Sequence, residues 1–187
     1  MKKFSPTIFV VFVFLFLFGC QQVARFGTDR KFSNLNYTGD GNFIDHGRKA
    51  GVFRFVLDLG EVDLREVSIR KFEMKGLPDV EFVCYLRVNH PLPLSGRPKD
   101  FKFGDLVVEM SLEDQNGKEV FSEKVPLKNW RWSGSVGAPK SDLYTGKTMF
   151  TSHEGQNYSI SLKIPEGNLQ APKAQLLLMG GGWKVVN

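Results

Sequence analysis

The two cysteines are the most reactive side chains in this sequence of 187 residues, and they lie in very different contexts. Cys20 follows an uninterrupted apolar run, Ile8–Phe18, and a single glycine, and the run itself comes shortly after Lys2 and Lys3. Positive charge, a short apolar core and a small residue at its end form the pattern of an export signal. A membrane-spanning helix needs roughly 20 apolar residues, so this run is too short for a simple membrane anchor.

The residues that end the run carry a family resemblance. Leu17-Phe18-Gly19-Cys20 resembles the lipobox of bacterial lipoproteins, which has an aliphatic residue, a tolerant position, a small residue and then cysteine. In that family the thiol receives a diacylglyceryl group, the peptide is cut before the cysteine, and the new amino terminus is usually acylated. The resemblance implies that residues 1–19 are a lipoprotein signal peptide and that Cys20 is lipidated. The alternatives are an ordinary secretory signal with an incidental cysteine, or an uncleaved anchor.

The same resemblance implies a location. One acyl chain anchors a protein only marginally, whereas two or three hold a soluble domain on a bilayer. In the sorting rule of enteric-type bacteria, aspartate directly after the lipidated cysteine favours the inner membrane, and here that residue is Gln21. We expect a lipid-anchored protein of the bacterial cell envelope, on the outer membrane and facing the periplasm if the organism has two membranes.

The residue types that usually perform catalysis or bind metals lack the necessary spacing. His46, His90 and His153 lie far apart, whereas zinc sites usually bring two ligands within a few residues. Ser133 does not lie in the Gly-x-Ser-x-Gly frame of serine hydrolases. Gly180–Gly182 is not followed by the helical pattern that a phosphate-binding loop requires. We expect no metal, no cofactor and no catalytic residue.

Three carboxylates keep a second class of function open. Glu61, Asp63 and Glu66 could supply an acid/base pair, although acids at a strand end are usually only solvated. Independently of this cluster, the alternative hypothesis is an enzyme that acts on cell-wall glycan or peptide through an acid/base pair assembled from distant strands, which leaves no local sequence motif.

The most suggestive local feature is Trp130-Arg131-Trp132, flanked by Lys128 and Asn129. In an extended segment the two indoles project to one side and the guanidinium to the other. If exposed, the indoles would form a flat platform that binds a sugar ring or a partner protein, since aromatic residues and arginine are favoured at interfaces. If enclosed, they would fill the core, where aromatic side chains bury large areas.

The remaining chain has the two-residue period of β-strands. Apolar residues alternate with polar ones, or follow one another, in six ranges: 51–59, 81–88, 106–113, 119–127, 158–164 and 174–179. Weaker strands are predicted at 66–75 and 148–151. Asn116-Gly117 predicts a hairpin turn. An edge strand is predicted near Asn42-Phe43-Ile44, a long extended loop at 89–98, and a glycine-rich loop through Gly146. Cys84 lies on the apolar face of its strand and is expected to be a buried hydrophobe.

Together these elements predict an all-β protein. Seven to nine short strands with frequent turns indicate an antiparallel β-sandwich, immunoglobulin-like or jelly-roll. We divide the chain into a signal peptide (1–19), a lipidated N-terminus and tether (20–49) and the sandwich domain (50–187). The layout and the lipobox together look like the small β-sandwich lipoproteins of unknown function found in many bacteria. A formal charge of +5, without a run of like charges, argues against nucleic acid. We expect a non-enzymatic binding or assembly module for an envelope protein or a glycan.

Overall fold

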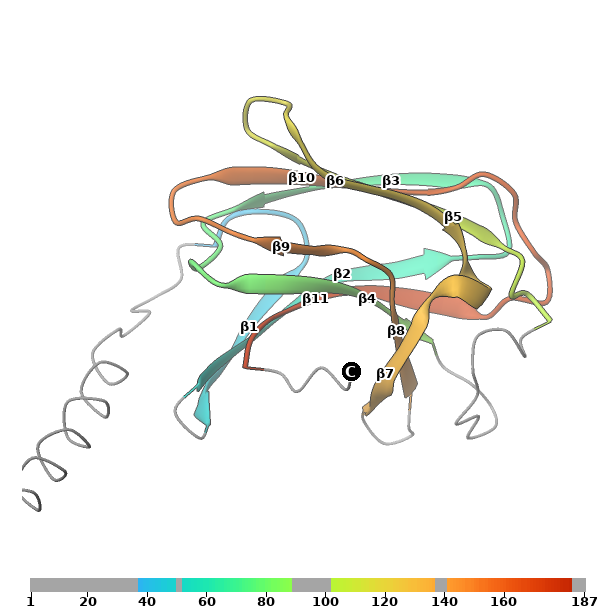
Figure 1. Ribbon diagram of the computed structural model, residues 1–187, viewed down its shortest axis with the longest axis horizontal. Coiled ribbons are helices and arrows are strands. Elements are labelled where there is room, and N and C mark those ends of the chain that lie inside the picture. The colour runs from blue at the N-terminus through green and yellow to red at the C-terminus, as the bar shows by residue number, and fades with distance from the viewer. Residues whose placement is uncertain (1–36, 50–51, 89–101, 137–140, 183–187) are drawn as a thin grey trace, which may run out of the picture.

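The computed structural model describes residues 37–49, 52–88, 102–136 and 141–182. Within these ranges the chain forms eleven strands and one short 3-10 turn. Two antiparallel sheets pack face to face as a β-sandwich, as the alternating pattern predicts (Figure 1). Cys20, His90, the predicted loop at 89–98 and the residues after Gly182 lie outside the described ranges.

The larger sheet has seven strands, and its order is β1-β2-β11-β4-β8-β7, with β9 pairing with β4. Its strands are β1 (Asn42–Lys49), β2 (Val52–Asp63), β4 (Glu81–Val88), β7 (Arg131–Val136), β8 (Ser141–Thr145), β9 (Met149–Thr151) and β11 (Lys173–Gly181). The edge strand predicted near Asn42–Ile44 is β1, so the sheet begins before residue 50.

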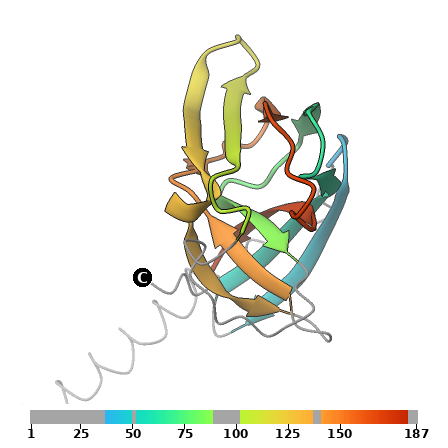
Figure 2. The same ribbon diagram turned by 90° about the vertical axis from the view of Figure 1, so that its right-hand side faces the viewer.

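The smaller sheet has four strands in the order β3-β10-β5-β6 and lies above the larger sheet in Figure 1. Its strands are β3 (Ser68–Lys75), β10 (Asn157–Ile164), β5 (Val107–Asp114) and β6 (Glu119–Pro126). The predicted hairpin joins β5 to β6 and projects beyond the rest of the sandwich (Figures 1 and 2). Gly117 has φ +74° at its tip, and the Asp114 carboxylate accepts bonds from the backbone N–H groups of Asn116 and Lys118.

The core lies between the sheets and contains the predicted apolar faces. Its fully enclosed members include Phe55, Leu57, Cys84, Leu86, Val108, Leu112, Ile160 and Leu178. Phe150 of β9 connects the two layers, because its ring lies 5.9 Å from that of Phe82 in β4 and 5.4 Å from that of Tyr158 in β10. The buried role predicted for Cys84 is confirmed.

The outer faces of the two sheets differ. On the smaller sheet most outward positions are polar or charged, although Ile69 of β3 is apolar and exposed, and Glu109 of β5 is bridged by Lys124 and Lys163 from the strands on either side. On the larger sheet five outward side chains are buried and form a second apolar cluster: Val83, Tyr85, Leu143, Leu177 and Met179. The larger sheet is therefore apolar on both of its faces.

The first described residues link both sheets, and we call residues 37–41 the N-terminal clasp. Thr38 N–H and Asp40 N–H donate to Lys75 O and Glu73 O of β3, and the Asp40 carboxylate accepts from Glu73 N–H at 2.7 Å. The ring of Tyr37 stacks on Phe43 of β1, with centroids 5.2 Å apart. The clasp thus holds β3 of one sheet, and β1 continues from it into the other.

Two strands of the larger sheet were not predicted from the sequence pattern. The segment through Gly146 was predicted as a loop, but residues 131–136 and 141–145 form β7 and β8, which makes the strand count higher than the seven to nine expected. All five residues of β8 are buried, and three of them are polar: Ser141, Asp142 and Thr145. A strand that is buried on both faces shows no alternation of polar and apolar residues, and polar residues within it make its sequence resemble that of a loop.

Candidate functional site

The segment with the two tryptophans crosses from one sheet to the other. A 3-10 turn, η2 (Leu127–Asn129), follows β6, and Trp130 N–H donates to Leu127 O at 2.9 Å. Trp130 is then only 3% exposed and belongs to the core. Trp130 lies where the chain crosses between the two sheets, and its indole is large enough to fill the space between them.

Trp132 has a different environment. It pairs with Tyr144 of β8, a core residue, and directly opposed residues project to one side of a sheet. Its indole therefore lies on the core side of β7 but at the edge of the sandwich, where it is 38% exposed and donates to Asp142 Oδ1 at 3.3 Å. Because Trp130 is enclosed, the two indoles do not form one exposed platform.

Arg131 projects to the opposite side and lines a groove with a volume of about 620 Å³. The groove lies where the edge of the smaller sheet meets β4, β7 and the connection between β8 and β9. Its walls are Val83, Glu123, Val125, Asn129, Arg131, Ser133, Thr145, Gly146, Lys147 and Met149. This volume falls within the range of ligand-binding clefts, roughly 300–1,000 Å³.

The cationic side chains of the groove are exposed. In the part of the chain that the structure describes, no carboxylate pairs with the guanidinium of Arg131 or the ammonium of Lys147. The one acid of the lining, Glu123, accepts a hydrogen bond at its Oε2 from the backbone N–H of Lys147, at 2.9 Å. The lining therefore has an excess of positive charge.

Glycine at position 146 permits this arrangement. A Cβ atom there would lie 1.9 Å from Glu123 Oε2, so any other residue would displace the carboxylate. Glu123 thereby ties β6 of the smaller sheet to the β8–β9 connection of the larger sheet. The groove wall is held in place across the gap between the sheets.

Its apolar surface comes from Val83, Val125 and Met149, and the Met149 side chain is 55% exposed. Val83 also belongs to the outer apolar cluster, so the groove continues into that face of the larger sheet. Behind it, burial raises the pKa of Tyr85, whose phenol shares a hydrogen bond with Ser133. Tyr85 supports the wall because it is buried and packs in the same apolar cluster as Val83.

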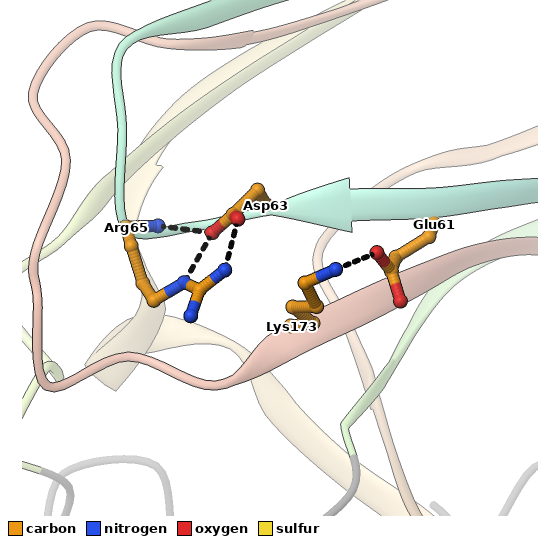
Figure 3. A network of polar contacts seen from close by, with 4 residues as sticks. All are labelled: Glu61, Asp63, Arg65 and Lys173. Carbon is orange, nitrogen blue, oxygen red and sulfur yellow. Dashed lines mark hydrogen bonds and ion pairs between the residues drawn. The ribbon is translucent and has the colours of Figure 1, made fainter.

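Two of the three carboxylates considered above, Glu61 and Asp63, each contact a basic side chain rather than one another (Figure 3). Hydrogen bonds from Arg65 hold the pKa of Asp63 well below its usual range, and Glu61 pairs with Lys173 at 2.5 Å. Glu66 is exposed. A general acid needs a pKa near the working pH, so an ionised, arginine-bound Asp63 is unsuited to that role.

The other residues with reactive side chains are separated. His46 and His153 are exposed, and His153 Nδ1 lies 3.5 Å from Asp79 Oδ1. No group of three or more potential ligands that could hold a metal occurs among the described residues. Burial raises the pKa of the Cys84 thiol, which makes it a poor nucleophile. None of the described helical segments is long and apolar enough to cross a membrane.

Of the residues that line the groove, the local sequence pattern draws attention to Arg131 and its neighbour Asn129, but not to Lys147, Glu123 or Met149. These residues come from β6, from the β8–β9 connection and from β9, which are brought together only by the fold. No local pattern marks them. The chain matches no known protein-family profile, and no curated protein shows significant sequence similarity to it.

Proposed function

We propose that this protein is a lipid-anchored bacterial envelope protein whose β-sandwich binds a partner through the groove beside Arg131. The proposal has two parts, an anchor and a binding surface. The anchor rests on Leu17-Phe18-Gly19-Cys20, directly after the short apolar run. The binding surface rests on two exposed cations without described acidic partners, at the rim of a partly apolar groove.

The length of the tether limits how far the domain can lie from the bilayer surface. A fully extended chain spans about 3.3–3.6 Å per residue, so the residues between Cys20 and Tyr37 could reach at most roughly 60 Å from the bilayer. This reach suits a module that binds another envelope component, on the periplasmic side of the outer membrane if there are two membranes. We propose a binding or assembly role without catalysis.

The anchor is tested by metabolic labelling with palmitate. Wild-type protein should incorporate label and remain in the membrane fraction, and Cys20→Ser should lose the label and be released or misprocessed. Cys84→Ser is the matched control, because it removes the other cysteine and should label normally. Normal labelling of Cys20→Ser would end the anchor proposal.

The binding role is tested by capture from solubilised envelope. Wild-type protein should retain a partner that the Arg131→Ala/Lys147→Ala variant loses, with Lys75→Ala/Lys118→Ala as the control. Both control lysines are exposed, and they lie on β3 and on the β5–β6 turn. Equal capture by all three proteins would remove the groove from the proposal.

A further inference from the structure

We propose that the groove binds an acidic segment of a partner protein, in which a carboxylate side chain lies next to an apolar one. This inference rests on the binding role proposed above and specifies the partner. It follows from the distribution of charge, apolar surface and aromatic residues around the groove.

Charge complementarity gives the sign of the ligand. Elsewhere many cations have acidic partners: Lys124 and Lys163 with Glu109, Lys128 with Asp105, and Lys173 with Glu61. At the groove, Arg131 and Lys147 have none among the described residues, and their two positive charges exceed the single negative charge of Glu123 in the same lining. An incoming carboxylate would therefore meet two unpaired cations, of which arginine can bind it through two parallel hydrogen bonds.

The apolar surface indicates a side chain rather than a bare anion. Val83 and Val125 form a hydrophobic wall, and Met149 is more than half exposed beside them. The flexible, polarizable side chain of methionine adapts well to a bound apolar group. A peptide with alternating acidic and aliphatic residues would occupy both kinds of surface.

The aromatic residues favour a protein over a glycan. Sugar-binding sites commonly stack a ring on an exposed aromatic side chain, and none lines this groove. Trp132, the one exposed tryptophan among the described residues, faces the other side of β7. Asn129 at the rim offers an amide that can both donate to and accept from a peptide backbone.

The test uses full-length purified protein in detergent and a fluorescein-labelled peptide of sequence EDLVEDL, measured by fluorescence anisotropy. Three competitors are compared: KKLVKKL, EDGSEDG and an oligosaccharide of galacturonic acid. We expect EDLVEDL to bind, KKLVKKL not to compete, and EDGSEDG and the oligosaccharide to compete at least tenfold more weakly than unlabelled EDLVEDL. Affinity should fall with added salt, because the contacts include exposed charges.

The variants locate the binding. Arg131→Ala/Lys147→Ala should weaken EDLVEDL binding at least tenfold and Met149→Ser at least threefold, whereas Lys75→Ala/Lys118→Ala should change it less than twofold. All substituted side chains are exposed, so the fold should survive, which circular dichroism checks. Equal binding by the groove variant and the control, or tighter binding of the oligosaccharide, would overturn the inference.

Failure of the peptide can be separated from failure of the proposed function. If no acidic peptide binds but the groove variant still loses a partner captured from envelope, the acidic-segment inference is wrong and the binding role stands. If the groove variant captures the same partners as wild type, the binding role of the groove falls as well.

Discussion

The two tryptophans that look equivalent in sequence should differ in their contribution to stability. Truncating a core tryptophan to alanine typically costs about 3–5 kcal/mol, since the lost transfer free energy is added to the cost of a cavity. Trp130, at 3% exposure between the sheets, should show this full cost. Trp132 is 38% exposed at an edge, so water can fill the space left by its removal and no cavity term arises. Its cost should be about 1–2 kcal/mol, from partial burial and one hydrogen bond to Asp142.

Urea unfolding followed by far-ultraviolet circular dichroism measures the difference without relying on tryptophan emission. With m of about 1–3 kcal/mol/M, a difference of about 2 kcal/mol separates the midpoints of the two alanine variants by roughly 1 M. Trp130→Phe provides a further check, because it should lower the urea midpoint less than Trp130→Ala does. The Trp130 Nε1 atom is buried without a hydrogen-bond partner, so phenylalanine keeps most of the packing and removes an unsatisfied donor. Equal midpoints for Trp130→Ala and Trp132→Ala would refute the assignment of one indole to the core and the other to the edge.

Three other predictions concern the sandwich. A Cβ atom on Gly180 would lie 2.5 Å from the ring of Phe82, so Gly180→Ala should lower the free energy of unfolding by about 1–3 kcal/mol through overpacking. In a thermal double-mutant cycle, the same substitution should cost less in a Phe82→Leu background. Additive costs of the two substitutions would contradict the contact. Hydrogen bonds from two lysines lower the pKa of Glu109, so its stabilising effect should be present above the pKa of the unfolded chain and be lost as pH falls through the folded pKa. Urea midpoints from neutral to acidic pH should therefore decline less in Glu109→Gln, and parallel declines would argue against the lysine bridge. In the Cys20→Ser protein, maleimide should react with Cys84 only as fast as the domain opens, whereas rapid reaction in native buffer would contradict its burial.

The fold was predictable where burial is one-sided. In β5 and β10 every second residue is enclosed, and the alternation gave both the strands and their inward faces. In β8 every residue is enclosed, and Asp142 and Ser141 made it resemble a loop. Periodicity reports a difference between two environments, so it fails for a strand that is surrounded by protein on both sides.

The candidate site was predictable only in part, for a different reason. Arg131 stood out because it lies between two tryptophans, and the alternation rule correctly sets it apart from them. Whether each indole is buried or exposed depends on the η2 turn and on how far each sheet extends, and neither can be inferred from the local sequence pattern. Lys147 and Met149 become neighbours of Arg131 only through the pairing of β7 with β8 and of β9 with β4.

The N-terminal clasp has a mechanical consequence. A pull on the chain ahead of Tyr37 is transmitted first to the hydrogen bonds with Glu73 and Lys75 in the smaller sheet and then, through β1, to the ladder with β2 in the larger sheet. Tension is thus divided between the two layers before either can peel away. If the domain hangs from lipid at Cys20, the point that carries the load is also the point where the sandwich is fastened on both sides.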